Sequence, residues 1–130
     1  MPDETGRVIG VGGVFIKSER HEQLSEWYQQ KLGLREVPGQ GVTLNWRDAD
    51  DPAKERLTIW STFPARSSYF GSSEAQFMIN YIVDDLDALL AKLKREGVQI
   101  DPKREDHDYG RFAWIFDLDG NKVELWEPPA

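Results

Sequence analysis

Residues 109–128 read "YGRFAWIFDLDGNKVELWEP", and this stretch has the pattern of a β-hairpin. Residues 111–117 and 122–128 are both strand-like, since aromatic and β-branched side chains dominate their apolar positions. Between them, "LDGN" at residues 118–121 contains the Asp-Gly-Asn sequence that favours a tight turn. The stretch therefore predicts two antiparallel strands, the second of which carries the carboxylate of Glu124.

Length and composition limit the class of protein. A chain of 130 residues, 39% hydrophobic and 30% charged, suits one soluble domain or two small halves. The absence of cysteine excludes disulfides, thiolate metal sites and cysteine nucleophiles. No apolar run approaches the roughly 20 residues that span a bilayer, and the polar start is unlike a secretory signal. We therefore expect a cytoplasmic protein that does not act in a membrane.

The net charge of −7 bears on the choice of partner. Nucleic-acid binding needs a surface rich in lysine and arginine, so we expect no nucleic-acid partner. An acidic chain is compatible with a cationic ligand, although the charge also serves solubility alone.

The pattern upstream of the hairpin predicts a strand, a helix and further strands, twice over. In the first half, strands are expected at 11–18, 41–48 and 56–63, with a helix that begins after Ser18 as N-cap and ends at Gly33. The second half opens with a strand at 77–83. An amphipathic helix follows, whose apolar stripe has helical spacing and which Gly97 closes; the stripe comprises Leu86, Leu89, Leu90 and Leu93.

Two landmarks indicate an internal duplication. The helix-ending glycines Gly33 and Gly97 are 64 residues apart (97 − 33). Matching the strands "LTIW" and "VELW" sets Trp60 against Trp126, 66 residues apart (126 − 60). Similar offsets from independent landmarks favour two related halves.

Duplicated halves that end in a D-x-D-G-N-x-x-E-L-W-E-P hairpin resemble the vicinal oxygen chelate superfamily, the group of glyoxalase I, bleomycin-resistance proteins and extradiol dioxygenases. The most specific segments are "WYQQKLGL" (27–34), "INYIVDDLDALLAKLKREGV" (79–98) and "GRFAWIFDLDGNKVELWEP" (110–128). The resemblance implies an α+β fold of two tandem βαβββ modules, which form a curled mixed sheet around a cavity. It implies one glyoxalase-like domain over residues 1–130, with modules at 8–62 and 76–128 and a linker at 63–75.

The resemblance also implies where a metal would be held. Metal-dependent members take His, Glu or Gln ligands from the first and last strand of each half, so that the ion polarises adjacent oxygens. The matching positions here are Gly13, Thr58, Met78 and Glu124. Glycine offers no side chain, a threonine hydroxyl is a poor ligand, and methionine suits soft metals. We therefore expect no metal site and no cofactor, with a divalent metal only under the alternative function.

Glu124 is the central candidate for ligand binding. Its carboxylate could act as a general base, bind a cationic group, or pair with a nearby arginine. Trp126 lies two residues from Glu124, and Trp60 two residues from Thr58, so each shares the face of that neighbour. These tryptophans either pack a core or form the wall of a pocket for a flat ligand.

Four further residues complete the predicted site. Lys17 has the strand parity of Gly13, and Asn80 has the parity of Met78, which would point both side chains toward the cavity. Tyr109 and Arg111 belong to "REDHDYGR" (104–111), interpreted as a charged loop over the cavity mouth. Rim salt bridges and an ordinary hydrogen bond of Asn80 are the alternatives.

The resemblance implies a small-molecule-binding protein of the glyoxalase and bleomycin-resistance type that lacks the family metal site. The alternative is a metal-dependent or metal-independent enzyme of the lyase or dioxygenase type. A third possibility is a half-inert chain that pairs with another. We expect an aromatic or cationic small-molecule ligand and a homodimer. The identity of the ligand is not contained in the sequence.

Overall fold

The computed structural model describes residues 6–37, 41–71 and 74–130, and these residues fall into two compact units. One unit is Gly12–Phe77, and the other joins the described residues up to Val11 with Met78–Ala130. Each contains one βαβββ module, so the predicted α+β fold class is confirmed.

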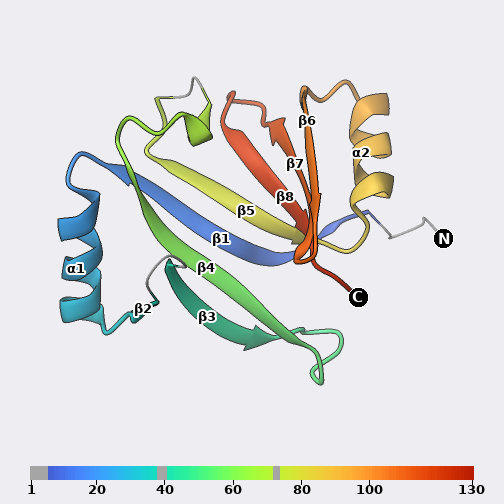
Figure 1. The fold of residues 1–130 in the computed structure, drawn as a ribbon. Helices are drawn as coiled ribbons and strands as arrows, with labels where there is room; N and C mark the ends of the chain where they lie inside the picture. Colours follow the sequence, from blue (N-terminus) through green and yellow to red (C-terminus); the bar gives the residue numbers. More distant parts are fainter. Residues whose placement is uncertain (1–5, 38–40, 72–73) are drawn as a thin grey trace. The chain divides into compact units, whose positions relative to one another are not determined.

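The first module consists of one helix and a mixed sheet (Figure 1). Its elements are β1 (Val8–Ser18), α1 (His21–Leu32), β2 (Glu36–Val37), β3 (Gly41–Arg47) and β4 (Glu55–Pro64). The strand order is β2-β3-β4-β1, in which β1 and β4 are parallel and the other neighbours are antiparallel.

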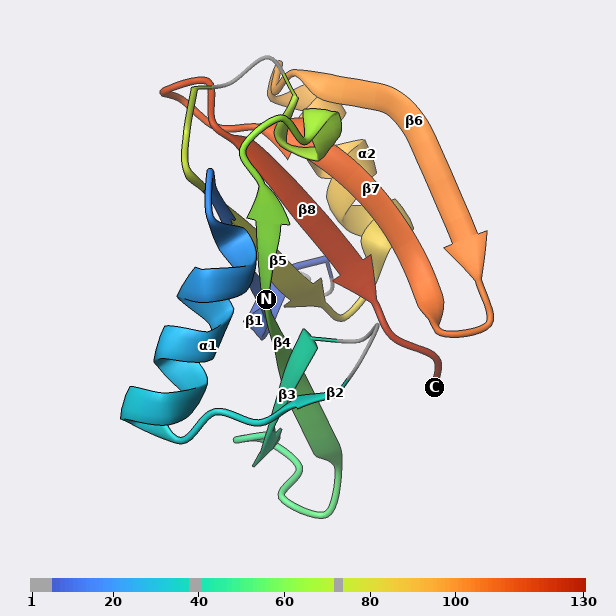
Figure 2. The ribbon, with the colours of Figure 1, turned by 60° about the vertical axis from the view of Figure 1, so that its left-hand side comes forward.

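The second module repeats this arrangement. Its elements are β5 (Phe77–Val83), α2 (Leu86–Arg95), β6 (Ile100–His107), β7 (Gly110–Phe116) and β8 (Lys122–Glu127). The strand order is β5-β8-β7-β6, again with one parallel pair, β5–β8. Figure 2 shows α2 behind β7 and β6, on one face of this sheet.

Both helices end as the sequence predicts. The C-cap of α1 is Gly33 in the left-handed region, with φ +75°, and its N–H donates to the carbonyl of Gln29. Gly97 follows α2 with φ +79°. In the predicted linker, β4 extends to Pro64 and a short 3₁₀ helix, η1, spans Ser68–Phe70.

The start of α1 differs from the prediction that Ser18 is its N-cap. Ser18 is the last residue of β1, and its Oγ accepts a hydrogen bond from the N–H of Arg20 at 3.1 Å. Arg20 then takes the N-cap position, without a capping hydrogen bond from its side chain. The serine hydroxyl forms a local turn, which competes with capping for the same side chain.

The predicted charged loop at residues 104–111 is also wrong. Its first half, residues 104–107, belongs to β6, and Gly110 and Arg111 begin β7; the two strands pair up to His107 opposite Gly110. Charged residues are compatible with this strand because β6 lies last in the strand order of its module, where charges limit pairing with other chains.

The helix-facing side of each sheet is apolar. In the first module Ile16, Val42 and Trp60 form a buried cluster, against which Leu24 and Tyr28 of α1 pack. In the second module the equivalent cluster comprises Val83, Leu86, Leu89, Ala113 and Leu125. Residues next to these along each strand therefore point to the opposite face of the sheet.

The described part of the chain contains no helix that is long and apolar enough to cross a membrane.

Candidate functional site

Glu124 lies at the centre of a buried polar cluster in the second module. It is the register partner of Asn80 in β5 and of Trp114 in β7, so the three side chains share one face of the sheet. The Nδ2 of Asn80 donates to Oε1 of Glu124, and Nε1 of Trp114 donates to Oε2 at 3.0 Å. All three residues are at most 3% exposed. Asn80 and Glu124, each predicted to face the cavity, are therefore brought together.

Sequence reasoning did not assign Trp114 to this cluster. The hairpin itself was identified, but counting outward from "LDGN" (118–121) pairs Trp114 with Leu125. The structure pairs Trp114 with Glu124, one residue away, so the sequence did not supply this register.

The hydrogen bond to Glu124 fixes the orientation of the Asn80 amide and so the position of its oxygen, Oδ1. Only its Nδ2 can donate to the carboxylate, which sets the direction of Oδ1. Oδ1 is buried and has no hydrogen-bond partner among the residues that the structure describes.

Aromatic rings extend the Glu124 face along the hairpin. Trp126 lies two residues from Glu124 and is the register partner of Phe112, and their rings stack at 5.9 Å with an angle of 5°. Phe112 also stacks on Trp114 at 6.5 Å. The structure therefore places Trp126 on the face predicted for it.

Tyr109 forms the turn between β6 and β7. Its carbonyl accepts a hydrogen bond from Nε1 of Trp126 at 2.9 Å, and its exposed ring stacks on His107 at 4.8 Å. Tyr109 is therefore linked to the aromatic rings of this face, although it lies at their edge.

Two lysines lie over the ring of Trp114. The Nζ atoms of Lys103 and Lys122 lie 5.2 and 5.8 Å from the centroid of the Trp114 ring. Glu105 bonds both Lys103 and His107, at 2.9 Å each. The hydrogen bond and charge of Glu105, with a smaller contribution from Glu124, raise the pKa of Lys103. His107 and Lys103 together hold the pKa of Glu105 below its usual value.

Arg111 is not on the Glu124 face, which corrects its prediction as a ligand contact beside Glu124. It adjoins Phe112, so alternation turns it to the helix side of β7. There its Nη1 lies 3.4 Å from Oδ2 of Asp87 in α2. Asp87 also binds Arg104 at 2.7 Å, and Arg104 followed by Arg111 lowers the pKa of Asp87.

Trp60 likewise faces the helix of its own module. It is paired with Val14 and lies 4.6 Å from the ring of Tyr28 in α1. Gly13 is paired instead with Ile59, so the predicted match of Thr58 with Glu124 was one residue out of register.

The match of Thr58 with Glu124 was wrong because it aligned Trp60 with Trp126. In the last strand of each module, the buried residue that faces the helix is Trp60 in β4 and Leu125 in β8, and these are 65 residues apart (125 − 60). Gly13 and Met78 are also 65 apart (78 − 13). The residue that matches Glu124 is therefore Ile59, whose side chain offers no metal ligand.

Lys17 lies on the predicted face of β1, the face of Gly13 and Phe15. Its Nζ is 5.0 Å from the centroid of the Phe70 ring. Phe70 belongs to a cluster of aromatic rings with Phe15, Phe63 and Tyr69. Lys17 therefore covers an aromatic cluster of the first module.

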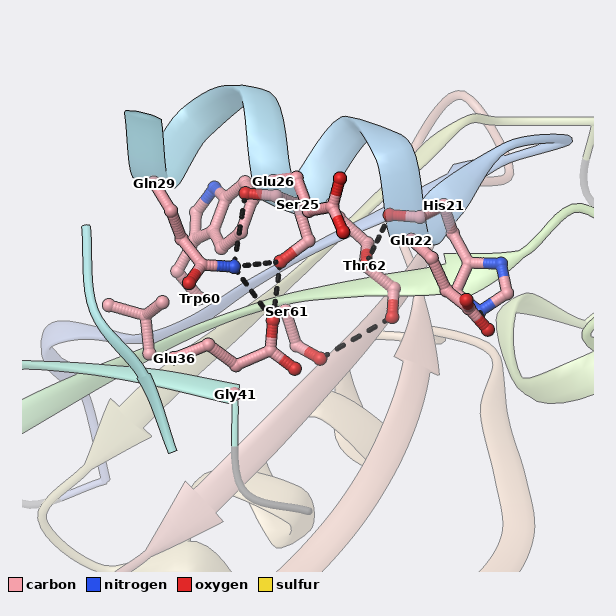
Figure 3. Close-up of a pocket in the computed structure, with 11 residues that line it drawn as sticks. His21, Glu22, Ser25, Glu26, Gln29, Glu36, Gly41, Trp60, Ser61 and Thr62 are labelled. Carbon is pink, nitrogen blue, oxygen red and sulfur yellow. Dashed lines mark hydrogen bonds and ion pairs between the residues drawn. The ribbon is translucent and has the colours of Figure 1, made fainter. Parts of the chain in front are cut away.

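A pocket of about 680 Å³ opens in the first module beneath α1 (Figure 3). Its lining residues come from α1, from β2 and the start of β3, and from β4: His21, Glu22, Ser25, Glu26, Gln29, Glu36, Gly41, Val42, Trp60, Ser61 and Thr62. Of the predicted site residues, only Trp60 belongs to it.

Hydrogen bonds fix one carboxylate at this pocket. Ser25 Oγ donates to Oε2 of Glu36, and Nε2 of Gln29 donates to the same oxygen at 3.2 Å and to Ser25 Oγ at 3.1 Å (Figure 3). Ser25 is buried, with 5% exposed, so α1 holds Glu36 in a defined position. These hydrogen bonds join α1 to β2, a short strand that the sequence analysis did not predict.

The charges of the pocket have one sign. Glu22, Glu26 and Glu36 are acidic, and none of the lining residues that the structure describes is a lysine or arginine. His21 lies 4.0 Å from Glu22. Carboxylates gathered in a concave site attract cations and disfavour anions. We call this site the acidic pocket.

One protein-family model covers both modules. The model of the Glyoxalase/Bleomycin resistance protein/Dioxygenase superfamily matches residues 14–125, a range that includes Glu124. The chain belongs to this superfamily. No curated protein matches the chain.

Solved structures with the same fold include enzymes. Methylmalonyl-CoA epimerase from Mycobacterium tuberculosis is 21% identical, with a TM-score of 0.60, and the match covers 100% of this chain and 94% of that one. A variant of the Streptomyces coelicolor methylmalonyl-CoA epimerase, in complex with 2-nitronate-propionyl-CoA, is 15% identical, with a TM-score of 0.68 and coverage of 95% and 100%.

A structure of different description is also similar. It is described as NAD-dependent benzaldehyde dehydrogenase from Legionella pneumophila, with 9% identity, a TM-score of 0.55 and coverage of 90% and 98%. Because all these identities are low, the likeness shows the fold, and the activity has to be argued from the site.

The donor set that the resemblance assigns to a divalent metal is incomplete in this chain. At the three positions other than Glu124, the residues Gly13, Ile59 and Met78 supply no oxygen or nitrogen side-chain ligand. Both carboxylate oxygens of Glu124 accept hydrogen bonds from nitrogen donors. Within the described residues, no group of three or more His, Cys, Asp and Glu side chains could hold a metal ion.

Proposed function

We propose that this superfamily member binds a small cationic molecule without the help of a divalent metal, and that the acidic pocket receives the cationic group. The observation that carries the proposal is the set of three carboxylates, Glu22, Glu26 and Glu36, around Trp60 in one pocket. The absence of a metal or other cofactor is part of the proposal.

The pocket offers a cation both charge and preorganisation. Glu36 is held by Ser25 and Gln29, so little side-chain entropy is lost when it accepts a further hydrogen bond. A charge-assisted hydrogen bond contributes about 1.5–3 kcal/mol, roughly ten- to a hundredfold in affinity. Trp60 adds an aromatic surface, which attracts cations and packs flat apolar groups.

Two commercial amines and one alcohol test separately how the positive charge and the aromatic ring of a ligand affect binding. Benzylamine is aromatic and cationic at neutral pH, cyclohexylamine is cationic only, and benzyl alcohol is aromatic only. We expect benzylamine to bind most tightly by isothermal titration calorimetry, cyclohexylamine more weakly, and benzyl alcohol not measurably. Added NaCl should weaken the binding of both amines, because it screens the carboxylates.

Two variants locate the site. Glu36→Gln keeps the side-chain shape and removes the charge, so benzylamine affinity should fall about tenfold or more. Glu96→Gln changes an exposed glutamate at the end of α2, in the other module, and should leave affinity unchanged. Equal affinity of benzylamine and benzyl alcohol, or no effect of Glu36→Gln, would refute the proposal.

An enzyme of the lyase or dioxygenase type, or one of related chemistry, is the second candidate. The observation in its favour is the fold shared with methylmalonyl-CoA epimerases. Incubation with methylmalonyl-CoA in deuterated water, followed by NMR, measures exchange of the substrate's α-proton. We expect no exchange above the uncatalysed rate, and enzyme-dependent exchange would favour the enzyme.

We also propose a cytoplasmic homodimer. Support for a partner comes from large apolar side chains that remain exposed in the first module, Trp27 at 51% and Leu32 at 61%. Light scattering should give twice the mass of the chain, and Trp27→Glu should reduce the measured mass to that of a single chain. A single-chain mass for the unchanged protein would refute the dimer.

A further inference from the structure

The buried amide of Asn80 is the starting point for a second binding site. Its Oδ1 lacks a partner among the described residues although the residue is only 3% exposed. Met78 and Ile82, on either side along the same face of β5, have no hydrogen-bond donor in their side chains. A buried acceptor of this kind calls for a donor that the described residues do not supply, since such groups are nearly always satisfied.

We infer that Asn80, Glu124 and Trp114 form a site for an ammonium-type cation that donates N–H hydrogen bonds, at the position where the family resemblance places a divalent metal. The cation is either a small ammonium ion or the terminal group of a larger amine. The acidic pocket of the first module is a separate site, so this inference does not depend on the proposed function.

The chemistry of the cluster favours an N–H cation over a metal ion. A metal needs several lone pairs directed at one point, whereas Asn80 Nδ2 and Trp114 Nε1 direct N–H groups at the Glu124 carboxylate. Asn80 Oδ1 supplies an acceptor, and the carboxylate supplies negative charge close to it. An ammonium group has several donors and needs only such acceptors around it.

The Trp114 ring already interacts with ammonium groups of this chain. Lys103 and Lys122 place their Nζ atoms 5.2 and 5.8 Å from its centroid. The negative face of an indole ring attracts cations in this range. These two lysines also repel an incoming cation, so binding at this site depends on the hydrogen bonds that Asn80 Oδ1 and the Glu124 carboxylate offer.

An ordered water molecule is the other source of a donor for Asn80 Oδ1. Water would satisfy the acceptor without adding positive charge beside Glu124. Methylammonium and tetramethylammonium separate the two cases, since both carry one positive charge but only the first has N–H donors.

The experiment follows the indole N–H resonances of the ¹⁵N-labelled full chain by NMR during titration with each chloride salt, at constant ionic strength. We expect methylammonium to shift the Trp114 resonance in a saturable manner, while tetramethylammonium and NaCl do not. The resonance of Trp27, which is exposed in the first module, serves as an internal reference. Equal responses to the two cations, or no response to methylammonium, would overturn the inference.

Variants tie the response to Asn80. Asn80→Leu removes the acceptor and should weaken methylammonium binding about tenfold or more. If Asn80→Leu does not fold, Asn80→Ser removes the amide acceptor but keeps a small polar side chain, and binding should again weaken. Glu36→Gln alters the acidic pocket alone and should leave the Trp114 shift intact. Unchanged affinity in the Asn80 variants, or loss of the shift in Glu36→Gln, would contradict the assignment.

Discussion

Glu124 and Trp114 face each other across the β7–β8 pair, and the indole N–H of Trp114 donates to Oε2 of Glu124 at 3.0 Å. Both residues are almost fully buried, at 3% and 2% exposed. Such a contact fixes the direction of the carboxylate, and it also limits which substitutions the site tolerates.

Replacing Trp114 by Phe removes the donor and leaves most of the ring in place. Because the buried carboxylate loses a hydrogen bond, the free energy of unfolding should fall by about 1–3 kcal/mol. Urea denaturation at neutral pH measures it. Leu118→Ala, at a fully exposed position, is the control and should change stability by less than about 0.5 kcal/mol. An equal effect of both substitutions would show that the hydrogen bond contributes little.

Gly110 is a second position where substitution should strongly lower the free energy of unfolding. Its φ is +134°, and a Cβ built there would overlap Nε1 of Trp126 and lie 2.7 Å from the carbonyl oxygen of Glu127. Gly110→Ala therefore combines backbone strain with a clash, and should lower the free energy of unfolding by more than about 3 kcal/mol.

Gly120 provides the matched control for Gly110. It also has positive φ, +83°, but its added Cβ would meet nothing within 4 Å. Gly120→Ala should therefore cost only the backbone strain, about 1 kcal/mol. The thermal midpoints of the two variants, compared with the unchanged protein, test the difference. Similar midpoints would mean that the chain around Trp126 moves aside easily.

Asp87 should make stability depend on pH. Arg104, followed by Arg111, lowers its pKa below the usual 3.8, so the ionised form is favoured in the folded state. The stabilisation is present above pH 3.8 and is lost as the pH falls through the lower folded pKa. Asp87→Asn should therefore destabilise at pH 7 and have little effect well below pH 3.8.

The size of this Asp87 effect is small. The side chain is 63% exposed, so we expect less than about 1 kcal/mol at pH 7, and less again in high salt. Urea denaturation at both pH values, with and without NaCl, measures it. A difference between Asp87→Asn and the unchanged protein that stays constant with pH would exclude the ion pairs as its cause.

Metal analysis tests the donor set around Glu124. Protein purified without chelators should contain well under one equivalent of Ni, Zn, Fe or Mn, and these ions should not raise the thermal midpoint. The reason is that Gly13, Ile59 and Met78 supply no suitable ligand at the matching positions. Stoichiometric metal that is lost in Glu124→Gln would contradict this expectation.

Much of the fold could be predicted from local patterns. The apolar stripe of α2, the glycines that end both helices and the turn of the last hairpin depend on residues close together in the chain. The assignment of Asn80 and Glu124 to one face also followed from strand parity and the family match, although their pairing was not predicted.

The errors concern alternation and long-range register. A one-residue shift in matching the halves moved Trp60 to the wrong face of the sheet, since side chains alternate along a strand. Arg111 was judged from its neighbours in sequence, whereas its parity directs it to Asp87. The acidic pocket was missed because Glu36 lies in a two-residue strand, too short for a sequence pattern.

The parallel pairs β1–β4 and β5–β8 have a consequence for the order of folding. Gly13 pairs with Ile59 over 46 residues (59 − 13), and Asn80 with Glu124 over 44 (124 − 80), whereas the antiparallel hairpins join neighbouring segments. Closing a long loop costs more chain entropy than closing a short one, so the hairpins should form first in each module.

Glu124 would then acquire its hydrogen bonds at different times. Its contact with Trp114 spans 10 residues and forms with the β7–β8 hairpin, whereas its contact with Asn80 spans 44 and forms when β5 docks. Substitution of Trp114 should therefore slow folding, while substitution of Asn80 should mainly speed unfolding. The two hydrogen bonds of this one carboxylate therefore form at an early and at a late step of folding.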